Sequence, residues 1–246
     1  MSPRPILLVH GAWHGTWCWA PLQAELDRLG VASWAIDLPG HGLSTERLGD
    51  LHTDADAVVA ALGAVRDGAD GDGVVLVGHS YGGGVITEAA TRAVAKDLPI
   101  AHLVYLTAYA TCAGESVGGL AAALPRENTP LGTVMQAQDD GTFGISPVDR
   151  ATDVFYGHCT PEQAATAFAR LSRQHGASFA QPGTGNPRDT IPSTYVVCTD
   201  DRAIHPNHQR IMATRCGAVH ELPTDHSPFM SMPAETAAIL ARIAGA

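Results

Sequence analysis

The most constraining feature of this chain is an apolar run that leads directly into a Gly-x-Ser-x-Gly motif. Val74–Val77 is typical of a buried strand, Gly78-His79-Ser80-Tyr81-Gly82 follows it, and the next residues can form a helix. A sharp strand-to-helix turn would hold Ser80 in a strained conformation and expose its hydroxyl above the sheet. Gly78 and Gly82 would be required because the two backbones pass too closely for side chains. The helix N-terminus would also favour negative charge beside the serine.

The distribution of apolar segments predicts an α/β fold, with a mostly parallel central sheet and helices on both faces. Six short runs are expected to form the strands: Ile6–Val9, Ala32–Ile36, Val74–Val77, Leu103–Leu106, Thr194–Cys198 and Ala218–Leu222. The first four of them are typical of strands buried on both faces. Helical spacing of apolar residues predicts helices between the strands and at the end of the chain, over Leu22–Leu29, Ala55–Val65 and Ala234–Ile243.

The 246 residues fit one domain, residues 1–246, with an insertion at about residues 112–192 that interrupts the alternation of strands and helices. Inside the insertion a helix is expected to follow Thr160, which would cap it, with Pro161 at the first helical position. We expect the insertion to lie over the sheet, because a structureless loop of that length would be unusual.

Charge limits the classes of partner that we expect for this protein, and the cysteines indicate its cellular location. The formal net charge is -10, Lys96 is the single lysine, and no basic cluster occurs, which argues against nucleic acid or an anionic membrane as partner. No apolar run is long enough to span a membrane, and a strand begins at Ile6 without room for a signal peptide. Five cysteines without CxxC spacing indicate free thiols and a cytoplasmic location. The oligomeric state stays open, with a homodimer as one option.

A serine nucleophile needs a base, and the base needs an orienting acid. In hydrolases with this kind of turn the order along the chain is serine, acid, histidine. Asp200 and Asp201 follow the strand at Thr194–Cys198, so they would lie at the same sheet edge as Ser80. Asp201 is favoured as the acid and Asp200 is its close rival, because one residue of register decides which carboxylate faces inward. Asp225 is a weaker candidate, since it adjoins the candidate histidine.

His226 is the candidate base among 12 histidines. It alone follows the acid, lies on a loop after a strand, and precedes the final helix. His205 and His208 lie too near the acid loop, His220 falls inside an expected strand, and His175 belongs to the insertion.

Two backbone amides are expected to stabilise the oxyanion of the reaction. One belongs to Tyr81, the residue after the nucleophile. The other would come from the loop after the first strand, His10-Gly11-Ala12-Trp13-His14-Gly15, in which Ala12 would offer its amide.

Taken together, these motifs make the chain resemble the α/β-hydrolase superfamily, within it the branch of plant methyl esterases and hydroxynitrile lyases with their bacterial esterase relatives. The resemblance covers nearly the whole chain and is carried by five segments: His10–Gly15 with Trp17-Cys18-Trp19 behind it, Asp37-Leu38-Pro39-Gly40-His41-Gly42, Gly78–Gly83, Val197–Asp201 with Pro206 and Gln209-Arg210, and Asp225-His226-Ser227-Pro228. It implies that the second acidic position, Asp201, is catalytic. It also implies that the insertion is a small cap, which covers the site and supplies most of the acyl pocket.

The chain departs from the hydroxynitrile lyases of this branch at two positions. They carry a lysine directly after the catalytic histidine, where this chain has Ser227, and a threonine in the oxyanion loop, where it has Gly11. Both differences favour ester hydrolysis. Related epoxide hydrolases and dehalogenases use an aspartate nucleophile, which Ser80 excludes.

The sequence therefore predicts a serine hydrolase that cleaves a small or medium carboxylic ester without a metal or other cofactor. Trp13 could reach the substrate, and Phe143, Phe155 and Tyr156 could either line the acyl site or fill the core of the cap. The alternatives are a ligand-binding receptor on the same scaffold, and a lyase or tailoring enzyme of a biosynthetic pathway.

Overall fold

A six-stranded parallel sheet forms the centre of the molecule. The computed structural model describes residues 2–66 and 73–246. The strand order is β2-β1-β3-β4-β8-β9, and every neighbouring pair is parallel. The strands are β1 (Ile6–Val9), β2 (Ser33–Ile36), β3 (Val74–His79), β4 (Ile100–Leu106), β8 (Ser193–Cys198) and β9 (Ala218–Leu222). The predicted fold class and all six predicted strands are confirmed.

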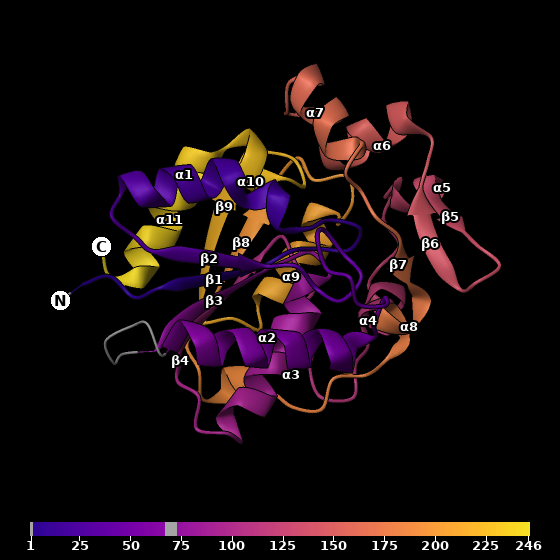
Figure 1. Cartoon of the computed structure of the whole chain (residues 1–246). Coiled ribbons are helices and arrows are strands. Elements are labelled where there is room, and N and C mark those ends of the chain that lie inside the picture. Colours follow the sequence, from indigo (N-terminus) through magenta and orange to yellow (C-terminus); the bar gives the residue numbers. More distant parts are fainter. Residues whose placement is uncertain (1, 67–72) are drawn as a thin grey trace.

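Helices cover both faces of this sheet (Figure 1). One face packs against η1 (Thr16–Trp19), α1 (Ala20–Arg28), α10 (Pro228–Ser231) and α11 (Pro233–Ala244). The other packs against α2 (Leu51–Arg66), α3 (Gly82–Val94) and α9 (Pro206–Ala213). Alternate strand residues serve the two cores: Ile6 and Leu8 face one, whereas Leu7 and Val9 face the other. Successive side chains of a strand point to opposite faces, and here both faces are covered by helices. These strands are therefore apolar at consecutive positions.

The strand β2 is less buried than its apolar sequence predicted. It pairs with β1 alone, and Trp34 keeps 41% of its surface exposed. The prediction of a strand buried on both faces is therefore wrong for Ala32–Ile36. The cause is the position of β2 at the edge of the sheet, which cannot be predicted from the number of apolar residues in the segment.

The chain between β4 and β8 forms a separate layer of short elements, and we call residues 112–192 the cap segment. Figure 1 shows most of it to one side of the sheet. Its elements are α4 (Val117–Ala123), α5 (Leu131–Val134), β5 (Met135–Ala137), β6 (Thr142–Ile145), α6 (Val148–Phe155), α7 (Pro161–Phe168), β7 (Gln174–His175), α8 (Gly176–Ala180) and η2 (Pro187–Asp189). The strands β5, β6 and β7 form a small antiparallel sheet. As predicted, Thr160 caps α7, in a reciprocal box with Gln163.

Topology gathers the functional loops at one place. The strand order reverses between β1 and β3, so the loops after these two strands diverge and leave a crevice at the carboxyl ends. The loop that starts at His10 and the turn at Ser80 are these two loops. None of the helices in the described part of the chain has the length and apolarity needed to cross a membrane.

Candidate active site

The turn between β3 and α3 has the strained geometry that the motif predicts. Ser80 has a φ of 51°, in the left-handed region that serine seldom occupies. A Cβ atom on Gly78 would lie 2.5 Å from the carbonyl oxygen of Gly82, and one on Gly82 would lie 2.7 Å from the carbonyl oxygen of His10. Both glycines are therefore required by close backbone contact, and the turn presents Ser80 at the crevice.

The structure brings His226 and Asp201 together. The Nδ1 atom of His226 lies 2.7 Å from Oδ2 of Asp201, and both side chains are almost fully buried. Asp200 is exposed and lies 3.4 Å from His158 Nε2. Asp225 accepts a hydrogen bond from the His158 amide instead of facing the ring of His226. Of the three candidate acids, Asp201 is the one that faces the histidine.

The carboxyl group of Asp201 accepts five hydrogen bonds. Its Oδ1 accepts from the amides of Ala203, at 2.7 Å, and Ile204, at 2.9 Å. Its Oδ2 accepts from His226, from Gln209 Nε2 at 2.9 Å, and from the hydroxyl of Thr107. Sequence reasoning assigned no role to Thr107 or Gln209. Thr107 directly follows β4, which places it at the same sheet edge as Ser80, and this position is the signal that could have identified it.

His79 connects the nucleophile turn to the candidate base. Its Nε2 lies 2.8 Å from the carbonyl oxygen of His226, and the two rings are 4.6 Å apart. A Cβ atom on Gly11 would lie 2.7 Å from His79 Nδ1 and 2.9 Å from Ser80 Cβ. The loop after β1 therefore packs directly against the serine, and His226 lies beside the residue that precedes it.

Three further histidines near the site are uncharged at neutral pH. Burial lowers the pKa of His14 to about 4, and burial lowers the pKa of His10 and of His79 well below the usual value. A positive charge that develops on His226 consequently meets no protonated ring among these neighbours.

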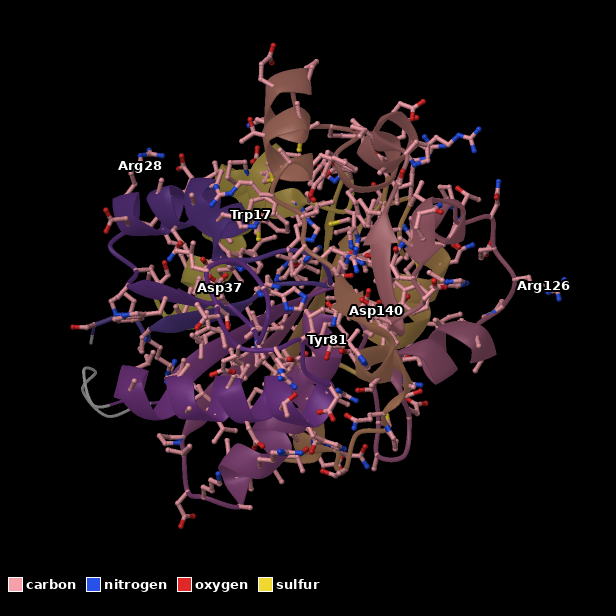
Figure 2. The ribbon with its side chains drawn as sticks, turned by 45° about the vertical axis from the view of Figure 1, so that its right-hand side comes forward. Trp17, Arg28, Asp37, Tyr81, Arg126 and Asp140 are labelled. Carbon is pink, nitrogen blue, oxygen red and sulfur yellow. The ribbon has the colours of Figure 1, made fainter. Side chains whose placement is uncertain are left out.

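Two backbone amides at the crevice are free to donate. Ala12 and Tyr81 are buried, and among residues 2–66 and 73–246 neither amide nitrogen has a hydrogen-bond acceptor. Buried amides are almost always paired, so two unpaired amides in the loops beside Ser80 indicate a place for a ligand oxygen. Figure 2 shows Tyr81 near the centre of the molecule, while Arg28 and Arg126 project at its periphery.

Aromatic side chains surround the site. The ring of Phe155 lies 5.8 Å from that of His226 and 6.0 Å from that of Trp13. Phe179, which sequence reasoning did not identify, lies 5.9 Å from Trp13 and 6.4 Å from Phe143. The structure thus brings Trp13, Phe143 and Phe155 into one group.

Tyr156 is placed differently from the other predicted substrate residues. Its hydroxyl lies 2.8 Å from His14 Nε2, and His14 Nδ1 lies 2.8 Å from the carbonyl oxygen of Ala12. Through this hydrogen bond the structure places Tyr156 as a support for the loop that carries Ala12. Contact with substrate stays a prediction for this residue.

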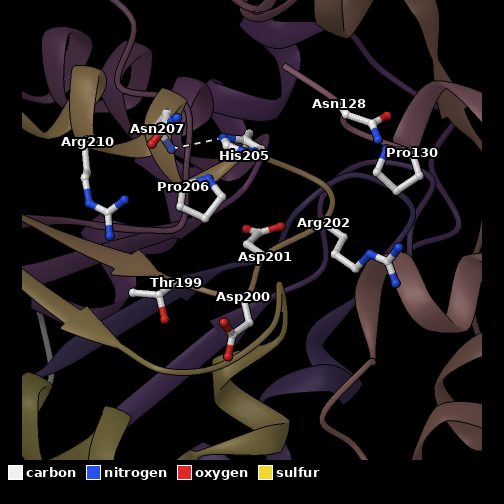
Figure 3. A pocket seen from close by; sticks show the side chains of 10 residues that line it. All are labelled: Asn128, Pro130, Thr199, Asp200, Asp201, Arg202, His205, Pro206, Asn207 and Arg210. Atoms are coloured by element: carbon white, nitrogen blue, oxygen red, sulfur yellow. Dashed lines mark hydrogen bonds between the residues drawn. The ribbon is translucent and has the colours of Figure 1, made fainter.

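A polar pocket of about 450 Å³ lies beside the loop that carries Asp200 and Asp201 (Figure 3). It is lined by Asn128, Pro130, Thr199, Asp200, Asp201, Arg202, His205, Pro206, Asn207 and Arg210. Neither Ser80 nor His226 lines it, so we do not assign it to the reaction. In the described part of the chain, no group of three or more His, Cys, Asp or Glu side chains is arranged to hold a metal ion.

Comparisons with known proteins identify the family of this chain. The model of the alpha/beta hydrolase family matches residues 6–239. The alpha/beta hydrolase nvfD of Aspergillus novofumigatus is 30% identical, over 95% of this chain and 93% of that protein. Methylesterase 2 of Arabidopsis thaliana is 26% identical, over 92% and 90% of the two chains.

A solved structure is also similar over the whole length. The pyrethroid hydrolase of Sphingobium faniae is 28% identical, with a TM-score of 0.84 over 99% of this chain and 98% of that chain. Relatives with esterase names support ester hydrolysis as the general activity. The chain belongs to the alpha/beta hydrolase family.

Proposed function

We propose that this protein is a serine esterase that cleaves small or medium carboxylic esters through an acyl-enzyme. The observation that carries the proposal is the buried pair of His226 and Asp201, 2.7 Å apart, beside the strained turn at Ser80. Relatives named methylesterase and pyrethroid hydrolase support hydrolysis as the reaction.

In the proposed reaction, His226 removes the hydroxyl proton of Ser80 while Ser80 Oγ attacks the ester carbonyl. The amides of Ala12 and Tyr81 donate hydrogen bonds to the oxyanion. The C–O bond to the alcohol then breaks, and His226 gives its proton to the leaving oxygen. Water next enters and loses a proton to His226 as its oxygen bonds to the acyl carbon. The bond from that carbon to Ser80 Oγ then breaks, His226 returns the proton to Oγ, and the carboxylic acid leaves. Asp201 fixes the tautomer of His226 throughout and stabilises its positive charge.

The acyl group is proposed to lie among Trp13, Phe155 and Phe179, with Phe143 behind them. These rings form one apolar group, of which Phe155 lies beside His226, with 5.8 Å between the ring centres. Such a surface favours an acyl chain or ring without charge, since a buried ion would lack a partner there.

The test compares Ser80→Ala with a control variant, Ser116→Ala. In the unchanged protein Ser116 caps the N-terminus of α4 in the cap segment. Turnover of p-nitrophenyl esters should fall by about 10⁴-fold or more in Ser80→Ala, because the covalent route is lost. Ser116→Ala should keep full activity. A fluorophosphonate should label the wild-type protein at Ser80 alone. Unchanged turnover in Ser80→Ala would overturn the proposal, whereas ligand binding without turnover or labelling would favour the receptor alternative.

A further inference from the structure

The residue that follows Ala12 is held by the cap segment. The amide of Trp13 lies 3.4 Å from Gln174 Oε1, and its carbonyl oxygen accepts hydrogen bonds from the amide of Ser172, at 2.8 Å, and from its hydroxyl, at 3.1 Å. The indole Nε1 donates to the carbonyl oxygen of Phe143 at 2.9 Å. Trp13 has a φ of 66°, which a bulky residue keeps only when its surroundings hold it there.

The side chain of Tyr81 is also held, from two sides. Its phenol donates to Oδ2 of Asp54, on α2, at 2.6 Å. From the cap segment, the ring of Phe179 lies 5.6 Å from that of Tyr81, edge to face, and Ser178, the neighbour of Phe179 in α8, has its hydroxyl close to the same phenol. Tyr81 therefore lies between α2 and α8, and a shift of α8 would be transmitted to it.

Gln174 joins these two attachments. Its Nε2 donates to Ser178 Oγ at 2.9 Å, while its Oε1 lies close to the amide of Trp13 and 2.9 Å from His41 Nε2. Gln174 and Ser178 are fully buried, so losing any of these hydrogen bonds would leave a buried polar atom unpaired. The network thus has one favoured arrangement.

We propose that Gln174 and Ser178 are positioning residues, which hold Trp13 and Tyr81 so that the amides of Ala12 and Tyr81 point to one oxyanion. This inference rests on the proposed function and adds to it a role for the cap segment in the chemical step. Oxyanion donors act at about 2.7–3.1 Å from the developing charge, so small displacements of either loop weaken them. Because Gln174 holds Trp13 and is bonded to Ser178 of α8, the helix that packs on Tyr81, the cap segment sets the two donors together.

The experiment compares Gln174→Leu and Ser178→Ala with Gln163→Leu. Gln163 is a glutamine of the cap segment whose side chain, among the described residues, accepts a hydrogen bond from the amide of Thr160 alone, at 2.8 Å. The measurements are kcat and KM for a p-nitrophenyl ester and inhibition by two ketones that carry the same acyl chain. A trifluoromethyl ketone forms an oxyanion with the serine, whereas the plain methyl ketone binds as an uncharged ground-state analogue.

In Gln174→Leu we expect kcat to fall by about 10- to 100-fold with KM changed less than about twofold, because donors that act in the transition state are misplaced. Affinity for the trifluoromethyl ketone should fall by a similar factor, and affinity for the methyl ketone should not change. Ser178→Ala should show a smaller effect of the same kind, and it removes so few atoms that it serves if Gln174→Leu does not fold. Gln163→Leu should behave as the wild type.

Two results would overturn the inference. Unchanged kcat in both network variants would show that the donors do not depend on them, and equal losses for both ketones would show a role in pocket shape alone. In either case an active wild type would leave the esterase proposal standing. A wild-type protein that turns over no ester would overturn both proposals at once.

Discussion

Two buried carboxyl groups flank the site, and they differ in how many donors they find. Asp201 accepts five hydrogen bonds on its two oxygens. Asp54 accepts one at Oδ2 from the phenol of Tyr81, and its Oδ1 has no partner among the described residues. Burial raises the pKa of Asp54 to about 7, and the charge of Asp50 adds to this, while the Tyr81 bond opposes it. For Asp54, one hydrogen bond does not offset the cost of burying a charge, so the proton is held more tightly.

The largest effect is expected from a change at Asp201, the carboxyl group with five donors. In Asp201→Asn, kcat/KM should fall by about 10⁴-fold, because an amide can donate to His226 Nδ1 and so favours the wrong tautomer of the ring. Asp200→Asn is the matched control and should stay within about twofold, since Asp200 is exposed and faces away. Ester turnover measures both variants. Equal losses in the two would contradict the assignment of the acid.

The second prediction concerns the pH dependence of stability that Asp54, the carboxyl group with one donor, should cause. An unfolded chain loses the Asp54 proton near pH 3.8, but the folded protein keeps it to about pH 7. Between these values the folded state binds the extra proton, so this group lowers the free energy of unfolding as pH rises, by up to about 4 kcal/mol. Above pH 7 its contribution is constant.

Asp54→Asn should remove this dependence. Urea unfolding of both proteins from pH 4 to pH 8 gives the difference between their free energies of unfolding. As pH rises, the wild type should lose stability relative to the variant, and the difference should then level off. Taking the difference cancels the buried histidines, whose lowered pKa values act with the opposite sign. A difference that does not change with pH would show that Asp54 is not the titrating group.

A third variant lowers the number of donors on Asp201. Gln209→Leu removes the hydrogen bond from Gln209 Nε2 to Asp201 Oδ2. It also leaves the buried amide of Cys198 without an acceptor, because this amide donates to Gln209 Oε1 at 2.8 Å. The free energy of unfolding should fall by about 2–3 kcal/mol. Asn207→Leu on the exposed side of α9 is the control and should change stability little. If the two variants unfold at the same urea concentration, the hydrogen bonds of Gln209, including the one to Asp201, add nothing to stability.

The smallest expected effect comes from Thr107→Val, which keeps the shape of the side chain and removes a single donor from Asp201. A loss of about 1 kcal/mol is expected, because four donors remain. Urea unfolding measures it alongside Gln209→Leu. A loss larger than that of Gln209→Leu would show that the Thr107 hydroxyl, and not Gln209, is the main support of the carboxylate.

Local patterns predicted the sheet and the chemical positions well. The apolar runs located all six strands, and strand ends located Ser80, Asp201 and His226 on one edge, because parallel strands end together. The choice between Asp200 and Asp201 needed the structure, since adjacent carboxylates differ only in the direction that the loop gives them.

The supports of the site could not be predicted, because they join distant segments. Gln174 lies 161 residues from Trp13 in sequence, and their contact arises only when the cap segment folds onto the loop after β1. Asp54 lies just before the predicted helix Ala55–Val65 and was not singled out, and only the packing of α2 against Tyr81 buries it. Gln209 was visible as part of a family motif, but its bond to Asp201 was not.

The two ends of the chain meet at the opposite edge of the sheet from the crevice. The amide of Arg4 donates to the carbonyl oxygen of Ala244 at 2.8 Å, and Figure 1 shows both ends far from the cap segment. A surface anchor or a fused protein attached at either end would therefore leave the approach to Ser80 open. The same proximity makes a circular permutant feasible, with a short linker joining the present ends and new ends opened in an exposed loop.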